Sequence, residues 1–300
     1  MSAADTTYDE AHLDGGGGAT PRRTSVSTER YLQLLKEVLS YSLWEEPGVP
    51  IGAFRVPRSR LRELLIAGVS GALRRRHLQL VRLPVATAEQ RRIGRVHPLM
   101  AETMIGLPRL DNIQNCVEQV IAEHVPGDLI ETGVWRGGAT IFMRAVLAAY
   151  GVTDRRVFVA DSFAGLPKPD EHTYSQDRGD QHHTFTHLAV SKDDVARNFE
   201  KYGLLDDQVV FLEGWFKDTL PSAPIDKLAV MRLDGDMYQS TIEALEALYP
   251  KLSPGGFCII DDYELEGCRG AVDDFRASQG ITEALIEIDW TGVFWRRAQY

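Results

Sequence analysis

The stretch Pro126-Gly-Asp-Leu-Ile-Glu-Thr-Gly-Val-Trp-Arg-Gly-Gly-Ala-Thr140 determines how the rest of the chain is interpreted. Pro126 and Gly127 end a helical pattern, and the short apolar run at 129–132 predicts a buried strand. Glycines follow directly, and apolar residues at three- and four-residue spacing then predict a helix over 140–150. A strand, a glycine-containing turn and a helix in this order are typical of the first unit of an α/β sheet.

The same alternation continues toward the C-terminus. Strands are predicted at 157–160, 208–212, 228–233 and 257–260, with helices near 193–202, 241–249 and 270–277. Strands separated by helices imply right-handed crossovers and a parallel sheet that is covered on both faces. The last segment differs, because Asp289-Trp-Thr-Gly292 joins two extended runs at 285–288 and 293–296. This pattern predicts a hairpin, so the sheet should end with an antiparallel strand.

Upstream of Pro126 the pattern is helical. Residues 1–26 contain a run of four glycines and a Ser/Thr-rich stretch, and we predict a disordered tail there. Residues 27–125 are predicted to form an N-terminal helical segment. Its first helix should begin with Ser27 or Thr28 as the N-cap. Its last helix should run from Leu110 or Asp111 to about Glu123, with Asp111 as the N-cap.

Residues 55–95 are rich in arginine, and apolar residues alternate with the charges at helical spacing. A basic amphipathic helix can lie on a membrane surface or dock an acidic partner. The same pattern also fits an ordinary helix with a solvated arginine face, or an inserted loop. We favour this second interpretation.

Composition limits the range of partners. The formal net charge of −10 disfavours non-specific binding to nucleic acid. No apolar run reaches the ~18 residues that a membrane-spanning helix needs, and the acidic N-terminus does not look like a signal peptide. The three cysteines lack metal-ligand spacing and are odd in number, so no disulfide framework is indicated. We therefore expect a cytoplasmic protein without a membrane or nucleic-acid partner.

Acidic residues follow two of the predicted strands. Asp234 lies in Leu233-Asp-Gly-Asp-Met-Tyr238, and Asp261 and Asp262 end the run that starts at Gly256. The carboxyl ends of parallel strands meet in the crevice where open α/β sheets bind ligands. Carboxylates that converge there repel one another unless a cation lies between them, and oxygen ligands favour Mg²⁺. The sequence therefore predicts a magnesium site.

The turn after the first strand indicates a cofactor site. Its spacing is G-x-x-x-G-G, which differs from the G-x-G-x-x-G that suits a dinucleotide pyrophosphate, and a tight turn without a ligand would also favour glycine. Asp161 ends the second strand, where an acid can accept hydrogen bonds from the ribose hydroxyls of an adenosine. Because no Walker-type Gly-Lys-Ser/Thr follows, S-adenosylmethionine fits better than ATP.

Several motifs together resemble the macrocin O-methyltransferase family, whose members methylate sugar hydroxyls of antibiotics such as macrolides and aminocoumarins. They are Met104-Ile-Gly-Leu-Pro-Arg-Leu-Asp-Asn112, Pro126 to Thr140, Gly214-Trp-Phe-Lys-Asp-Thr-Leu-Pro221 and Leu233-Asp-Gly-Asp-Met-Tyr-Gln-Ser-Thr241. The resemblance covers about residue 98 to the end. It implies a Rossmann-like class I methyltransferase domain at 126–300, with a mostly parallel seven-stranded sheet.

The resemblance also implies roles for residues. Asp234, Asp261 and Asp262 would hold Mg²⁺, with Asp234 and Asp236 in catalysis and Asp236 as the candidate base. The cofactor, S-adenosyl-L-methionine, would contact Met104, Glu131, Thr132, Gly133, Trp135, Gly138, Ala139, Thr140, Asp161, Ser162, Gly214 and Trp215. The substrate would be a small glycosylated metabolite that is methylated on a deoxysugar hydroxyl.

A polar segment at 165–194 contains Tyr174, His182, His183 and His187, and its length after a strand predicts a lid. The N-terminal helices should cover the acceptor site or form contacts in a homodimer or higher oligomer. Two alternatives stay open at this point. One is a methyltransferase for a catechol-like phenol, and the other is a catalytically silent adenosyl-binding protein that docks a partner.

Overall fold

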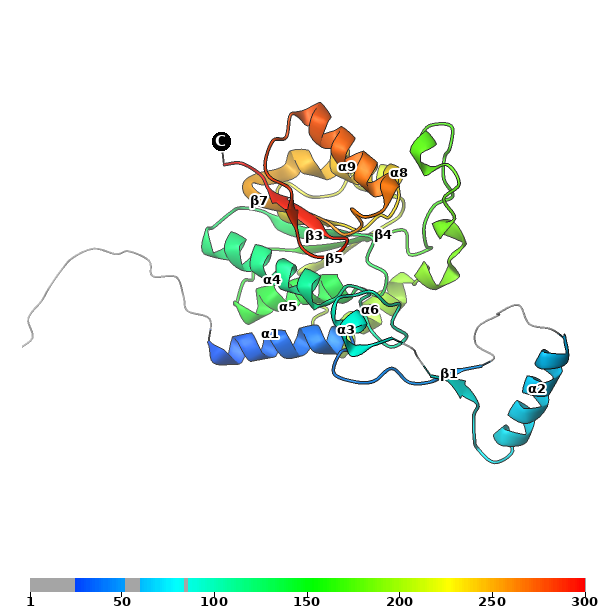
Figure 1. The fold of residues 1–300 in the computed structure, drawn as a ribbon. Helices are drawn as coiled ribbons and strands as arrows, with labels where there is room; N and C mark the ends of the chain where they lie inside the picture. Colours follow the sequence, from blue (N-terminus) through cyan, green and yellow to red (C-terminus); the bar gives the residue numbers. More distant parts are fainter. Residues whose placement is uncertain (1–24, 52–59, 84–85, 300) are drawn as a thin grey trace, which may run out of the picture.

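The computed structural model describes residues 25–51, 60–83 and 86–299, and its centre is a seven-stranded sheet (Figure 1). In chain order its strands are β3 (Asp128–Thr132), β4 (Val157–Asp161), β5 (Val209–Glu213), β6 (Leu228–Leu233), β7 (Leu252–Ile260), β8 (Ile286–Glu287) and β9 (Val293–Arg296). They lie side by side in the order β5-β4-β3-β6-β7-β9-β8. The first five are parallel, and β9 pairs antiparallel with both β7 and β8. The predicted mostly parallel sheet and C-terminal hairpin are confirmed.

The sheet has a switch point at β3. The chain builds outward from β3 to β4 and β5, then returns to add β6 on the other side of β3. Ligands bind outside the carboxyl ends of the strands at such a point, because the flanking connections leave in opposite directions. All six residues of β6 are buried, as expected for a strand that is covered on both faces.

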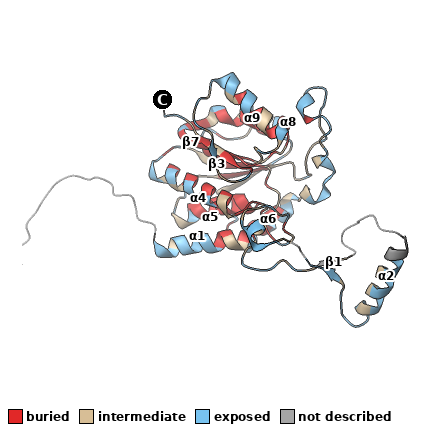
Figure 2. Ribbon diagram, viewed as in Figure 1, coloured by how far each residue is buried: buried red, intermediate tan, exposed pale blue. Residues whose placement is uncertain are grey.

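Helices cover both faces of the sheet (Figure 2). Those that follow the sheet's strands or flank them are α4 (Leu107–Ala122), α5 (Gly138–Ala149), α6 (Lys192–Lys201), α7 (Phe216–Thr219), α8 (Tyr238–Leu248) and α9 (Glu266–Gln279). Buried residues of α1, α4, α5 and α6 form one apolar core against the sheet, and those of α8 and α9 form the other. None of the helices within the described ranges is both long and apolar enough to cross a bilayer.

Two N-terminal helices begin earlier than predicted. Helix α1 (Val26–Leu39) has Ser25 as its N-cap, whose side chain accepts a hydrogen bond from the backbone of Thr28. Helix α4 begins at Leu107 behind Gly106, because Pro108 suits the first turn and needs no partner for an N–H. The prediction of Asp111 as an N-cap is therefore wrong. Its side chain pairs instead with Lys36 of α1, which joins the two helices.

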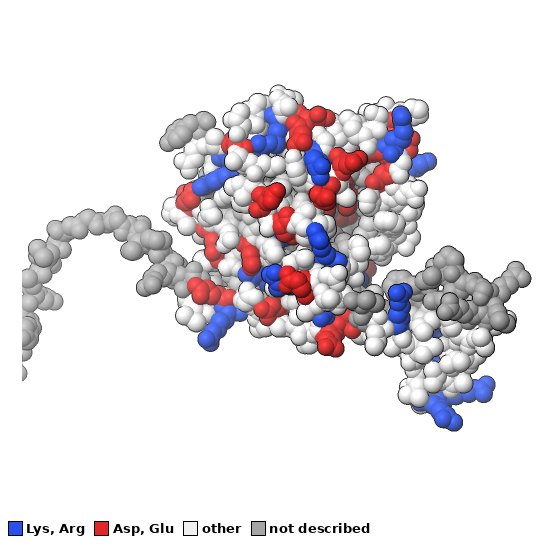
Figure 3. All heavy atoms as spheres, in the orientation of Figure 1, with Lys and Arg blue, Asp and Glu red and all other residues white. Residues whose placement is uncertain are grey.

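The arginine-rich stretch forms an arm that stands apart from the body (Figure 1). It consists of helix α2 (Arg60–Arg74) between two short strands, β1 (Val49–Pro50) and β2 (Val81–Arg82), which pair with each other in a sheet of their own. The short helix α3 (Ala88–Arg92) follows it. Figure 3 shows basic side chains at the end of the arm, where Arg74, Arg75 and Arg76 are exposed. The predicted tail at 1–26 lies almost entirely outside the described residues.

Candidate active site

Three carboxylates converge at the carboxyl ends of the two central strands. Asp234 and Asp236 follow β6, and Asp262 follows β7. One oxygen of each lies within 4.8 Å of the others. The backbone N–H of Asp236 also donates to the Asp262 carboxylate at 3.3 Å, and Asp236 has a positive φ of 56° that turns the chain back toward β7. The sheet therefore holds an all-oxygen donor set of the kind that Mg²⁺ prefers.

The carboxylates of this cluster resist ionisation. Burial and the neighbouring carboxylates raise the pKa of Asp234 and of Asp262 well above the ordinary range. Burial also raises the pKa of Asp236, to about 6, although His182 opposes the shift. Three acids in this condition are poorly stable as anions unless a cation shares their oxygens. The cluster therefore fits a divalent cation both by ligand chemistry and by charge.

Asp261 occupies a different environment from the one predicted. One of its oxygens accepts a hydrogen bond from Arg109 and the other accepts one from Arg232. Burial acts to raise the pKa of Asp261, but these two guanidinium groups outweigh it and lower the pKa. The structure thus brings Asp236, and not Asp261, together with Asp234 and Asp262.

A buried arginine lies beneath the cluster. Arg232 of β6 is almost fully buried, and it pairs with Glu131 of the neighbouring strand β3 and, at 2.9 Å, with Asp234. Arg109 of α4 also pairs with Asp289 at 3.0 Å, so it ties the helix to the C-terminal hairpin. The sequence interpretation missed both arginines. The signal that could have found Arg232 is a charged residue inside an otherwise apolar strand.

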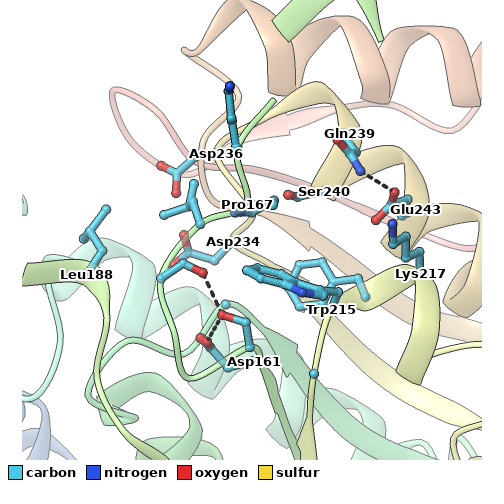
Figure 4. A pocket seen from close by; sticks show the side chains of 18 of the residues that line it. Asp161, Pro167, Leu188, Trp215, Lys217, Asp234, Asp236, Gln239, Ser240 and Glu243 are labelled. Atoms are coloured by element: carbon cyan, nitrogen blue, oxygen red, sulfur yellow. Dashed lines mark hydrogen bonds between the residues drawn. The ribbon is translucent and has the colours of Figure 1, made fainter. Parts of the chain in front are cut away.

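One cavity lies at the ends of β3, β4 and β5 (Figure 4), and it has a volume of about 230 Å³. Its wall contains seven of the residues predicted to contact a cofactor: Met104, Gly133, Trp135, Asp161, Ser162, Gly214 and Trp215. Leu166 and Pro167 of the predicted lid border the same space. The sequence interpretation missed Lys217, Gln239, Ser240 and Glu243, which come from α7 and α8.

Gly133 is needed where β3 turns into the cavity. Its φ is +79°, and a Cβ atom there would lie 1.7 Å from the carbonyl oxygen of Asp234. Asp161 holds the same turn in place, because its carboxylate accepts from the backbone of Val134 at 2.8 Å and of Phe163 at 2.7 Å. Burial raises the pKa of Asp161 despite these bonds. The turn therefore forms a fixed part of the wall of this cavity.

The remaining predicted cofactor residues lie behind this wall. Thr132, Gly138, Ala139 and Thr140 are buried and line neither cavity. The Thr140 hydroxyl donates to Glu131, and Gly138 packs against the backbone of Glu102. Glu131 is paired with Arg232 and borders the second cavity instead. These five residues form the turn and the packing behind it. The spacing of glycines in the sequence cannot distinguish such residues from residues that contact a cofactor directly.

The second cavity is larger, about 670 Å³, and it opens on the other side of the carboxylates. All four aspartates at 234, 236, 261 and 262 border it, together with side chains from the segment 94–97, the predicted lid and the C-terminal hairpin. Five residues line both cavities: Met104, Trp135, Leu188, Asp234 and Asp236. The two aspartates therefore stand where the two spaces meet.

The segment 165–194 folds over both cavities as three short 3-10 turns, at Ser175–Asp177, His182–Thr184 and Thr186–Leu188. It is anchored by Asp177, which accepts from the backbone N–H groups of Tyr238 and Gln239 at 2.7 and 2.9 Å. His182 and His187 border the second cavity, whereas His183 borders neither. His182 is oriented by Asp180 through a 2.6 Å contact.

Comparisons with known proteins identify the family of the chain. A family model described as macrocin-O-methyltransferase (TylF) matches residues 28–297. The chain is 60% identical to 8-demethyl-8-(2,3-dimethoxy-alpha-L-rhamnosyl)-tetracenomycin-C 4'-O-methyltransferase of Streptomyces olivaceus, over 70% of this chain and 80% of that protein. It is 53% identical to mycinamicin III 3''-O-methyltransferase of Micromonospora griseorubida, over 70% and 84%.

Among solved structures, the O-methyltransferase NovP is 46% identical and superimposes with a TM-score of 0.76, covering 90% of this chain and 99% of that one. A match along nine-tenths of the chain, with identities this high, leaves no room for a chance resemblance. The chain is an O-methyltransferase and belongs to the macrocin-O-methyltransferase (TylF) family.

Proposed function

We propose that the protein is an S-adenosyl-L-methionine- and Mg²⁺-dependent O-methyltransferase that methylates a deoxysugar hydroxyl of a glycosylated secondary metabolite. One observation carries this proposal: two separate cavities meet at Asp234 and Asp236. A methyl transfer needs a donor and an acceptor that approach each other in line, with acid–base groups beside the reacting oxygen. One cavity for each reactant, with carboxylates at the junction, satisfies that need.

The smaller cavity suits the methyl donor. It lies at the sheet's switch point, its glycine turn lets the backbone approach a ligand, and Asp161 is at the end of the second strand where ribose hydroxyls would be bound. Trp215, which is 38% exposed, offers a ring face to the adenine. When bound, S-adenosyl-L-methionine supplies a methyl group on a cationic sulfur, and an acidic junction favours that charge.

Mg²⁺ would be held by Asp234 and Asp262, whose oxygens lie together with that of Asp236 and border the second cavity, while Asp236 stays free of the ion. When bound, the ion stabilises the negative charge that develops on the acceptor oxygen. Asp261 would join this set only by giving up an arginine, since both of its oxygens are already engaged. Arg232 and Arg109 instead fix Asp261, and Arg232 also orients Asp234.

Asp236 is the group best suited to remove the proton of the acceptor hydroxyl. It stands at the junction of the cavities, and burial raises its pKa to about 6 in the metal-free protein, so that at neutral pH it is ionised and able to accept a proton. The lid segment covers the junction through Leu188, which lines both cavities. Its closure would exclude water from the reacting atoms.

The acceptor class rests on the relatives. The two curated relatives act, by their names, on a rhamnosyl-tetracenomycin and on mycinamicin III. The test is to incubate the purified protein with S-adenosyl-L-methionine and each of these two compounds, with and without EDTA. We expect one methyl group to be added, as measured by mass spectrometry, and the addition to stop in EDTA and return with Mg²⁺. Methylation of a free catechol with none on either glycoside would contradict the proposed acceptor class.

We also propose that the protein is a homodimer or higher homo-oligomer, with the arm as a contact. Helix α2 exposes Leu64, Leu65 and Val69, which are between 49% and 72% accessible, on the part of the molecule farthest from the core. Apolar side chains gathered on an exposed helix mark an interaction surface more often than chance. The arm's basic end would complement the acidic remainder of a second copy.

A further inference from the structure

The second cavity has two chemically different ends. Its inner end is acidic, with the aspartate cluster and Glu131. Its outer end is formed by aromatic rings and Arg95 from three separate elements: Trp290 of the C-terminal hairpin, Phe185 and His187 of the lid segment, and His97. A volume of about 670 Å³ lies within the range of pockets that enclose a drug-sized ligand, roughly 300–1,000 Å³. The cavity therefore has room beyond a single sugar ring.

Trp290 is held rigidly although it is 39% exposed. Its indole N–H donates to the carbonyl of Ile93 at 2.9 Å, and the Arg95 guanidinium lies 4.8 Å from the ring centre. The turn that carries it is fixed by Asp289, whose carboxylate accepts from Arg109 and from the backbone of Gly292 at 2.8 Å. An exposed indole that is fixed by three contacts is preorganised for binding, because little side-chain entropy remains to be lost.

Phe185 presents a second apolar surface from the lid segment, and it is 45% exposed. It stacks on His187 with ring centres 5.8 Å apart and meets the edge of His182 at 5.5 Å. The indole N–H of Trp135 holds the backbone of His187 at 3.0 Å, and Trp135 lines both cavities. The position of Phe185 is thus tied to the junction where methyl transfer would occur.

We propose that Trp290 and Phe185 are specificity-determining residues that pack against the aglycone of the acceptor, while the acidic end of the cavity takes its sugar. This inference rests on the proposed function. The aglycone is broad and apolar, because the surfaces offered to it are aromatic rings. A sugar that carries only a small group in place of the aglycone fills the inner end and leaves both rings exposed.

The test compares two acceptors with the same sugar. One is 8-demethyl-8-(2,3-dimethoxy-α-L-rhamnosyl)-tetracenomycin C, and the other is methyl 2,3-di-O-methyl-α-L-rhamnoside, in which a methyl group replaces the aglycone. In Trp290→Ala we expect KM for the full glycoside to rise about 10- to 100-fold, since burying a large aromatic contact is worth that factor, with kcat nearly unchanged. KM for the methyl rhamnoside should stay within about twofold of the wild-type value.

Two further variants keep the result interpretable. Phe185→Ala, on an exposed segment, should also raise KM for the full glycoside and leave KM for the methyl rhamnoside nearly unchanged. This variant replaces Trp290→Ala in the test if Trp290→Ala does not fold. Trp44→Ala is the matched control, because Trp44 is 47% exposed and borders neither cavity, and it should change neither KM. Thermal unfolding and S-adenosylhomocysteine binding report on the integrity of each variant.

Two results would overturn the inference alone. One is an unchanged KM for the full glycoside in both cavity variants, and the other is an equal rise in KM for both acceptors. A wild-type enzyme that methylates neither the glycosides of the panel nor the methyl rhamnoside would overturn the proposed function together with the inference. The wild-type assay therefore separates the two failures before any variant is measured.

Discussion

At the scale of single residues, Asp236 combines a position between two cavities with a pKa raised from 3.8 to about 6 by burial. Asp236→Asn keeps the size of the side chain but cannot accept a proton. We expect kcat to fall about 10²- to 10⁴-fold, the usual contribution of a general base, with S-adenosylhomocysteine affinity unchanged.

The pH profile distinguishes a base from a structural residue. In the wild type, kcat/KM should rise with pH in a range below about 6, because Asp236 must lose its proton before it can accept one from the acceptor and bound Mg²⁺ lowers the pKa that burial raises to about 6. The residual activity of Asp236→Asn should lack this rise. Asp207→Asn, at an exposed position away from both cavities, is the control and should keep the wild-type profile. A retained acidic limb in Asp236→Asn would assign the titration to another group.

The identity of the metal ligands gives a second prediction at this scale. Mg²⁺ that binds only the folded state at a hundredfold excess over its Kd should add about 2.7 kcal/mol to the free energy of unfolding. Asp262→Asn should abolish this gain, because it removes a member of the carboxylate cluster. Asp261→Asn should keep the gain although it lowers the stability without metal, since it breaks contacts with Arg109 and Arg232. Thermal unfolding with and without Mg²⁺ measures both.

The sign of the pH effect on stability follows from the same shift. The folded state holds the Asp236 proton more tightly than the unfolded state, so without metal the free energy of unfolding should fall as the pH rises from about 4 through 6. The stabilisation by Mg²⁺ should therefore grow over the same interval, because the cation binds the ionised form. If Asp261→Asn also lost the stabilisation by Mg²⁺, Asp261 would be a ligand together with Asp234 and Asp262, as predicted from the sequence.

At the scale of elements, the turn between β3 and α5 depends on Gly133. In Gly133→Ala the added Cβ would lie 1.7 Å from the carbonyl oxygen of Asp234, so that carbonyl would have to move. The alanine would also have to adopt a φ of +79°. We expect a loss of about 3 kcal/mol or more in urea unfolding and weaker S-adenosylhomocysteine binding. The matched control is Gly280→Ala at the end of α9, where φ is +65° but nothing lies within 4 Å. It should cost only the strain of the left-handed conformation, about 1–2 kcal/mol. Equal losses in the two variants would show that the close approach to Asp234 is unimportant.

Most elements could be predicted from the sequence because their signals are local. The strand 228–233 has the same bounds in the prediction and in β6, since a run of apolar residues is bounded by a charged turn on each side. Strand β7 starts at Leu252, five residues before the predicted start, because Pro254 and two glycines in its first half look like a turn. Leu252 pairs with Leu228 of β6, the register then shifts until Phe257 pairs with Val230, and Gly255 and Gly256 instead form backbone hydrogen bonds with Arg297 beyond β9.

The site was harder to predict than the fold, for a physical reason. The sequence placed Asp234 and Asp262 at strand ends, and the structure brings them together. Which neighbour joins them depends on side-chain direction, and successive residues after a strand point to opposite sides. Asp261 therefore meets Arg109, which is 152 residues away in the chain, and no local pattern contains that contact. Trp290 likewise enters the second cavity only through the fold of the C-terminal hairpin.

At the scale of the whole molecule, the N-terminal segment divides into a part within the core and a part outside it. Leu32, Leu35 and Leu39 of α1 are buried with α4 and α5 in one apolar core. The arm from β1 to β2 instead pairs with itself, and its helix stands away from the body. The arm can therefore be removed without opening the core, and its removal tests the proposed oligomer contact.

The deletion is geometrically simple, because Val49 and Arg82 are paired across the two short strands and a few Gly/Ser residues can join their neighbours. Replacing residues 49–82 in this way should leave the thermal midpoint within a few degrees, keep S-adenosylhomocysteine binding and convert an oligomer to a monomer in light scattering. Leu64→Ser combined with Leu65→Ser keeps the chain length and should have the same effect on mass, because it removes the apolar surface while the arm stays in place. An unchanged mass in both variants would show that the subunit contact lies elsewhere. Loss of S-adenosylhomocysteine binding in the deletion variant would show that the arm is required for the structure of the cofactor site.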